Sequence, residues 1–252
     1  MASRRRPPDS GVEGAASLPG ASSPPASSPA AAPPARMPVL PSGAQSEAPG
    51  DRGHAPDGER KHAICVFCGA RKGNDPGFVQ LASRVGAAIA RRGWVLVYGG
   101  SSVGLMGELA DAALAVGGEV LGIIPQQLVR QEVGHTGLTR LEIVEDMAAR
   151  KTRMISVSDG FLALPGGFGT LDELFEVVTL RQIGVHAKPI ALCDPSGYWS
   201  PMLAACRTMV DSGLVSLRDY ESMAHCRSVE AALDELAPQD GRAARQEGTA
   251  MR

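Results

Sequence analysis

The stretch GFLALPGGFGTLDELF, residues 160–175, has the pattern of a buried strand, a glycine-rich turn and the start of a helix. The run before Pro165 is continuously apolar, as expected of a strand that is covered on both faces. Pro165 ends the strand, and Gly166, Gly167 and Gly169 permit positive φ angles in the turn. This stretch therefore predicts one strand–turn–helix unit of an α/β protein.

The same alternation of apolar runs and helical patterns extends through the chain from residue 63 and predicts a doubly wound parallel sheet with helices on both faces. The expected strands span residues 63–68, 94–98, 119–124, 140–144, 160–164 and 189–193. Helices are expected from Asp75 to Gly93, from about 105 to Gly117, and over residues 146–157, 170–182 and 198–212.

Composition divides the chain into three parts. Most of the 19 prolines precede residue 61, in runs rich in Ala and Ser that show no apolar period. Such a composition buries too little apolar surface to offset the entropy lost on ordering. We therefore expect a disordered arm over residues 1–60, a single folded domain over residues 61–237, and a flexible tail over residues 238–252.

Charge and cysteine usage narrow the kind of partner. The net charge of −2 and the lack of a basic stripe argue against a nucleic-acid polymer, and no apolar run reaches the ~18 residues of a membrane span. The five cysteines form an odd set in or near apolar stretches, as expected of reduced thiols in a cytoplasmic protein. Cys65 and Cys68 form a C-x-x-C, but a strand would point them to opposite faces, so we predict no metal or cofactor. A small-molecule ligand is expected instead.

Two glycine-rich turns follow predicted strands, where open α/β sheets bind their ligands. The first is YGGSSVGLMG, residues 98–107, in which Gly99, Gly100 and Gly104 bring bare backbone close to a ligand or pack the helix tightly against the strand. The sequence leaves both readings open.

In the second turn, Thr170 precedes helical amides that have no internal partner, so the amides and the hydroxyl suit a phosphate. The alternative is a capping box, in which Glu173 bonds back to the backbone of Thr170. Glu173 lies off the core stripe of Leu171, Leu174, Phe175 and Val178. In the first turn it also feels the positive field of the helix end, which favours an ionised carboxylate that acts as an anion and not as an acid.

A third pattern is EDMAARKTRM, residues 145–154. Asp146 is placed to cap a helix, and Met147, Arg150 and Met154 then share one face. A guanidinium on a face that leans toward the core needs a polar partner, which is either a structural carboxylate or a ligand. Arg153 falls on the far side and is expected to be solvated.

Together, VFCGA, YGGSSVGLMG, DMAARKTRM and LPGGFGTLDEL resemble the Lonely Guy family of cytokinin riboside 5′-monophosphate phosphoribohydrolases, once labelled lysine decarboxylases. The resemblance covers residues 62 to about 235. It implies a Rossmann-like homodimer that hydrolyses the N-glycosidic bond of a cytokinin riboside or adenosine 5′-monophosphate. A nucleotide carrier or sensor on the same fold is the alternative. Apolar helix faces around residues 105–116 or 170–183 are candidates for the dimer contact.

The resemblance also assigns site residues. Arg150 and Glu173 match the family's catalytic pair, with Glu173 expected to stabilise the oxocarbenium-like sugar and orient water, and Arg150 to stabilise the substrate or the departing purine. The expected substrate contacts are Lys151 and Glu132, the second turn with Gly166, Gly167, Phe168, Gly169 and Thr170, and the first turn with Gly99, Gly100, Ser101 and Gly104.

The chain departs from the family pattern at several positions. Ala148 replaces the family's histidine, Arg71 stands in the last position of the usual CGSS, and Ser101 replaces a common third glycine. These departures leave the catalytic pair intact and the base preference open.

Overall fold

The computed structural model describes residues 60–129 and 134–238. The expected arm, apart from residue 60, and the expected tail, apart from residue 238, lie outside the described residues. The helices found in these two ranges include none that combines the length and the hydrophobicity of a membrane span.

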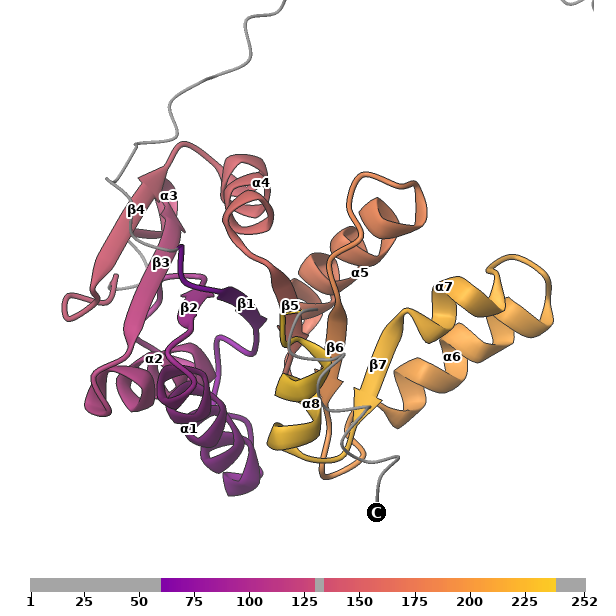
Figure 1. Cartoon of the computed structure of the whole chain (residues 1–252), viewed down its shortest axis with the longest axis horizontal. Coiled ribbons are helices and arrows are strands. Elements are labelled where there is room, and N and C mark those ends of the chain that lie inside the picture. The colour runs from indigo at the N-terminus through magenta and orange to yellow at the C-terminus, as the bar shows by residue number, and fades with distance from the viewer. Residues whose placement is uncertain (1–59, 130–133, 239–252) are drawn as a thin grey trace, which may run out of the picture. The chain divides into compact units, whose positions relative to one another are not determined.

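Among the described residues, seven parallel strands form one sheet in the order β4-β3-β2-β1-β5-β6-β7, which confirms the predicted parallel α/β fold (Figure 1). The strands are β1 (Ala63–Phe67), β2 (Val95–Tyr98), β3 (Glu119–Pro125), β4 (Arg140–Val144), β5 (Gly160–Ala163), β6 (Ile190–Cys193) and β7 (Met223–Cys226). The six predicted strands agree with β1 to β6 to within one residue at each end.

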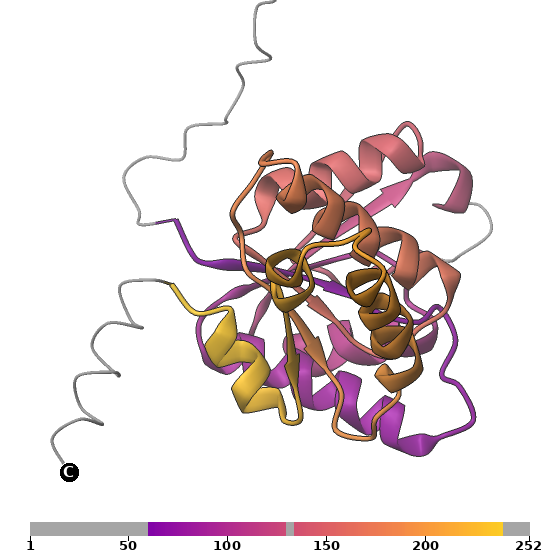
Figure 2. The same cartoon turned by 90° about the vertical axis from the view of Figure 1, so that its right-hand side faces the viewer.

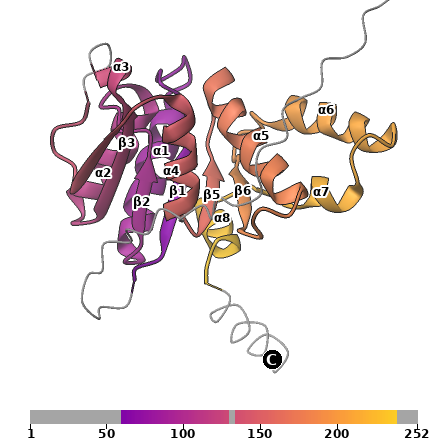
Figure 3. The same cartoon turned by 90° about the horizontal axis from the view of Figure 1, so that it is seen from above.

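Helices cover both faces of this sheet (Figure 2). One face packs against α1 (Pro76–Arg91), α2 (Gly104–Ala115) and α8 (Val229–Glu235). The other packs against α4 (Met147–Val157), α5 (Phe168–Gln182), α6 (Ser200–Asp211) and α7 (Leu217–Glu221). A short helix, α3 (Gln126–Val129), follows β3. Figure 3 shows α4 and α5 on the same side of the sheet. The sheet is thus the middle layer of three.

Side-chain caps fix the starts of two helices as the sequence predicted. The carboxylate of Asp75 accepts a hydrogen bond from the Gly77 amide at 2.8 Å, and Pro76 follows it in the first turn of α1. The carboxylate of Asp146 accepts from the Ala149 amide at 2.8 Å and fixes the start of α4, which carries Arg150.

The strand order reverses between β1 and β5, because β2 to β4 lie on one side of β1 and β6 and β7 lie beyond β5. Such a switch point leaves a crevice at the carboxyl ends of the two central strands. The two loops that border it are joined by a hydrogen bond from the Gly69 amide to the Pro165 carbonyl at 3.2 Å. The fold therefore places its ligand crevice beside the second glycine turn.

The sequence missed four short elements, namely α3, α7, β7 and α8. Each has between 4 and 7 residues. The helices among them are too short for a helical period to stand out from the surrounding sequence. Strand β7, MAHC, lacks the continuous apolar run that marks the equally short strands β2, β5 and β6. Strand β7 is also only partly buried, because it forms one edge of the sheet.

Candidate active site

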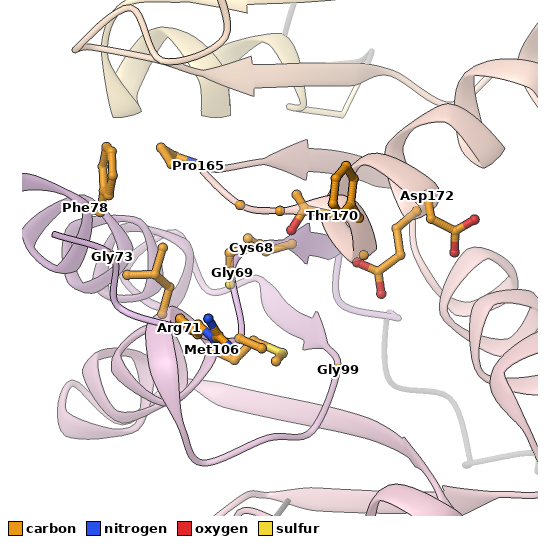
Figure 4. A pocket seen from close by; sticks show the side chains of 18 of the residues that line it. Cys68, Gly69, Arg71, Gly73, Phe78, Gly99, Met106, Pro165, Thr170 and Asp172 are labelled. Carbon is orange, nitrogen blue, oxygen red and sulfur yellow. The ribbon is translucent and has the colours of Figure 1, made fainter. Parts of the chain in front are cut away.

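A cavity of about 520 Å³ opens over the carboxyl ends of the central strands, a size typical of small-molecule sites. Its walls come from the loops after β1, β2, β5 and β6 and from the starts of α4 and α5. Figure 4 shows Arg71 and Met106 on one side of this cavity and Thr170 and Asp172 on the other. Parts of all three sequence patterns therefore meet at one place.

The second glycine turn forms the start of α5, two residues earlier than predicted. Gly167 is the N-cap residue, with no side-chain hydrogen bond, and Thr170 lies inside the first turn. The capping box headed by Thr170 is therefore wrong, because its cap position is taken by a glycine. The first backbone N–H groups of α5 have no acceptor within the helix. They lie beside the cavity, whose lining includes Gly167, Phe168, Gly169 and Thr170.

The glycines of this turn do not adopt a left-handed backbone, and of the three only Gly166 is required by close packing. None of Gly166, Gly167 and Gly169 has a positive φ, and that of Gly167 is −99°, so the predicted reason for these glycines is wrong. A Cβ atom at Gly166 would lie 2.0 Å from Oγ1 of Thr170. Gly166 is therefore needed for the turn to fold back onto its own helix.

Arg150 and Glu173 face each other across the cavity. Nη2 of Arg150 lies 3.4 Å from Oε1 of Glu173, and both side chains are about nine-tenths buried. The contact is longer than the ~2.8 Å of a tight charge-assisted hydrogen bond. Nη1 of Arg150 contacts Sδ of Met147 at 3.6 Å, and its buried Nε has no hydrogen-bond partner among the described residues. The guanidinium therefore keeps donor capacity for a ligand.

The protonation of Glu173 differs from the prediction. The field of the helix end was expected to keep this carboxylate ionised, but burial raises its pKa to about 7 against the lowering effect of Arg150. The predicted preference for the ionised form is therefore wrong for the free protein below about pH 7. Glu173 also lies on the buried stripe of α5 with Thr170, Leu174 and Val177, and burial penalises its charged form more than the helix end favours it.

The first glycine turn contributes Gly99 directly. A Cβ atom at Gly99 would lie 2.0 Å from Nη2 of Arg150, so only glycine leaves room for the guanidinium. Gly100, Ser101 and Gly104 do not line the cavity. Ser101 is fully buried and accepts a hydrogen bond from the Val103 amide at 3.3 Å, whereas Gly104 packs on the backbone of Ala70.

Lys151 does not line the cavity, although it follows Arg150 in the chain. Its Nζ pairs with Asp172 at 3.0 Å and with Glu176 at 2.9 Å, both on α5. These carboxylates raise the pKa of Lys151, so it is held as a cation that joins α4 to α5. The other expected contact, Glu132, lies outside the described residues.

Several cavity residues were missed by sequence reasoning, namely Cys68, Arg71, Phe78, Met106 and Tyr198. Tyr198 donates a hydrogen bond from its hydroxyl to the carbonyl of Gly166 at 2.6 Å, and its ring meets Phe78 edge-on at 5.4 Å. Arg71 and Tyr198 follow β1 and β6, so the rule that ligands bind at the carboxyl ends of strands is the signal that would have found them.

Among the described residues, no group of three or more His, Cys, Asp or Glu side chains is arranged to hold a metal ion. All five cysteines are free and buried. Cys65 and Cys68 pack into opposite core layers, as predicted, and burial raises the pKa of the Cys68 thiol.

Comparison with known proteins identifies the family. Residues 106–236 match the family model described as "Possible lysine decarboxylase". The cytokinin riboside 5′-monophosphate phosphoribohydrolase of Rhodococcoides fascians is 42% identical over 172 residues, which are 68% of this chain and 87% of that protein. The protein of the same name from Mycobacterium tuberculosis is 41% identical over 69% of this chain and 93% of its own length.

Solved structures share the fold at lower identity. The molybdenum cofactor binding protein of Rippkaea orientalis has a TM-score of 0.55 and 23% identity, covering 70% of this chain and 96% of its own. The molybdenum cofactor carrier protein of Chlamydomonas reinhardtii has a TM-score of 0.54 and 23% identity, covering 70% and 98%. At this identity the likeness establishes the architecture alone.

Proposed function

Because the chain belongs to the Lonely Guy family, whose matched relatives are named cytokinin riboside 5′-monophosphate phosphoribohydrolases, we propose that it hydrolyses the N-glycosidic bond of adenosine or cytokinin riboside 5′-monophosphate. The products are the free base and ribose 5-phosphate. Family membership supports the reaction class, and the cavity supports the assignment of roles to its residues.

The observation that carries this proposal is the pairing of Arg150 with Glu173 inside a cavity bordered by free helix amides. A buried guanidinium with an unsatisfied Nε calls for a polar ligand. The first turn of α5 offers amides that suit a phosphate. A phosphate held there places the attached sugar next to the Arg150 and Glu173 side chains that line the same cavity.

The chemistry follows from the charges that develop when the bond breaks. As the bond from C1′ to the base nitrogen opens, positive charge grows on the sugar ring and negative charge on the base. Ionised Glu173 stabilises the sugar and orients the water that attacks C1′, while Arg150 stabilises the departing base. The water supplies a hydroxyl to C1′ and a proton to the base, so no redox partner is needed.

The lysines do not suit the older decarboxylase reading, which requires a lysine to form a Schiff base with pyridoxal phosphate. Each of the four has a polar partner: Lys61 pairs with Glu119, Lys72 with Glu108, Lys151 with two carboxylates of α5, and Nζ of Lys188 donates to the Ile155 carbonyl. Of the four lysines, only Lys72 lines the cavity. Its Nζ forms an ion pair with Oε1 of Glu108 at 2.6 Å.

We further propose that the protein works as a cytoplasmic homodimer that pairs through α5. The alternative face, on α2, is a core contact, because Leu105, Leu109 and Ala113 are buried within the chain. On α5, by contrast, Phe168 is 91% exposed and begins a groove that Leu171, Phe175 and Leu180 line. An apolar groove of this kind supports an interface with a second copy. The five free, buried thiols fit a reducing compartment.

The test is incubation with AMP and with isopentenyl-AMP in parallel, with chromatography of the products. The proposal predicts base and ribose 5-phosphate in equal amounts from at least one substrate, and the faster substrate identifies the base preference. Nucleotide that binds and is recovered intact would establish a carrier or sensor in place of the hydrolase.

A further inference from the structure

Arg71 lies in the loop after β1, which borders the crevice at the switch point of the sheet. It lines the same cavity as Arg150 and Glu173, and Figure 4 shows it on the opposite side from Thr170. The loop after the first strand and the loop after β5 thus approach one ligand from two sides.

The backbone that carries Arg71 is held firmly between the two glycine turns. The Gly69 amide donates to the Pro165 carbonyl at 3.2 Å, and the Leu105 amide donates to the Gly69 carbonyl at 3.0 Å. A Cβ atom at Gly104 would come within 2.3 Å of the Ala70 carbonyl, so α2 also packs directly on this loop. The backbone next to Arg71 is therefore fixed by two segments, the second glycine turn and the start of α2.

Not every charged side chain around the cavity has a partner of opposite charge. Arg150 faces Glu173, Asp172 pairs with Lys151, and Lys72 pairs with Glu108. The guanidinium of Arg71 has no carboxylate partner within residues 60–129 and 134–238. Arg71 is thus a cation without a carboxylate partner in the described part of the chain, and it lines a cavity that the first turn of α5, which also favours an anion, lines from the other side.

A second observation that points to a ligand site is the buried Nε of Arg150, which has no partner among the described residues. We propose that Arg71 binds the 5′-phosphate of the nucleotide from the side opposite α5. This inference rests on the proposed function, because it takes the ligand to be a nucleoside monophosphate. The family's usual CGSS pattern has an uncharged serine at this position, so a charged contact here goes beyond that pattern.

The experiment compares AMP with adenosine, which lacks the phosphate. Kd is measured by calorimetry for the Glu173→Gln protein, so that AMP is not consumed, with and without Arg71→Ser. Arg91→Ser is the matched control, because Arg91 is exposed in the last turn of α1 and does not line the cavity. Arg71→Ser should weaken AMP about tenfold, as expected for one charge-assisted contact that is partly exposed to water, and leave adenosine unchanged.

Equal losses for AMP and adenosine, or no loss for either, would overturn the role of Arg71. In the catalytically intact protein, Arg71→Ser should raise KM for AMP by a similar factor with little change in kcat, because the contact is made in both the ground state and the transition state. A protein that binds AMP through Arg71 but never cleaves it would contradict the proposed function alone, so the two failures are distinguishable.

Discussion

Burial raises the pKa of Glu173, although Nη2 of Arg150 lies 3.4 Å from its carboxylate and lowers that pKa. Its pKa in the folded protein, about 7, lies above the ordinary value of 4.5. Protonated Glu173 therefore stabilises the fold fully below about pH 4.5, and this contribution is lost as the pH rises through 7. The residue that the reaction needs as an anion is thus costly to ionise.

This cost predicts a pH-dependent difference in stability between the wild type and Glu173→Gln. Relative to the wild type, the variant should gain up to ~3 kcal/mol in free energy of unfolding between pH 5 and pH 8, because it has no carboxylate to ionise. Urea denaturation at the two pH values measures this without substrate, whose phosphate titrates near pH 6. A constant difference across that range would mean that Glu173 keeps its ordinary pKa.

The burial of Glu173 could not be predicted from the sequence. Helical spacing placed it at the turn, and the family resemblance paired it with Arg150, which the structure brings together. Spacing placed it off the core stripe, however, and the actual stripe includes Thr170 and Glu173. The direction of a helix face depends on what packs against it, and the sequence of the helix alone does not contain that information.

At the scale of elements, residues after β6 and on β7 stabilise the second glycine turn, which lies between β5 and α5. The carboxylate of Asp194, at the end of β6, is fully buried and accepts hydrogen bonds from the amides of Tyr198 and Trp199 at 2.6 and 3.0 Å. It also contacts Nε2 of His225 on β7 at 3.0 Å. The hydroxyl of Tyr198 in turn donates a hydrogen bond to the Gly166 carbonyl. The last two strands therefore orient the turn that starts α5.

Tyr198→Phe should loosen this turn while preserving the ring that packs on Phe78. Loss of one neutral hydrogen bond, worth about 1 kcal/mol, predicts a KM for AMP raised roughly three- to tenfold and a smaller change in kcat. Steady-state kinetics measures both constants. Tyr220→Phe, on α7 and outside the cavity, is the control, and equal effects of the two variants would contradict the account.

The long helices and the apolar strands were predictable, and the short helices and the mixed strand β7 were not. Six strands and five helices follow from apolar runs, caps and glycine stops, because the strands are mainly apolar and the helices are long enough to show a period. Strand β7, which supplies His225 to the buried Asp194, is four residues of mixed polarity. The aromatic wall of Phe78 and Tyr198 joins residues 120 positions apart in the sequence, which only the strand order brings together.

At the scale of the whole molecule, the exposed apolar side of α5 predicts self-association. Leu180→Glu places a charge in the groove beside Phe175 and should convert a dimer to a monomer, as measured by light scattering coupled to size-exclusion chromatography. Leu214→Glu is the matched control, because Leu214 is 79% exposed and lies outside this groove. A dimer that survives Leu180→Glu would place the interface elsewhere.

The most direct test of the account is the comparison of binding and turnover in Glu173→Gln. The variant keeps the shape of the side chain and removes its charge, so AMP should bind with nearly the wild-type Kd while release of adenine slows about 10²- to 10³-fold, as expected for loss of one preorganised electrostatic partner. Adenine release at the wild-type rate would contradict the catalytic role of Glu173.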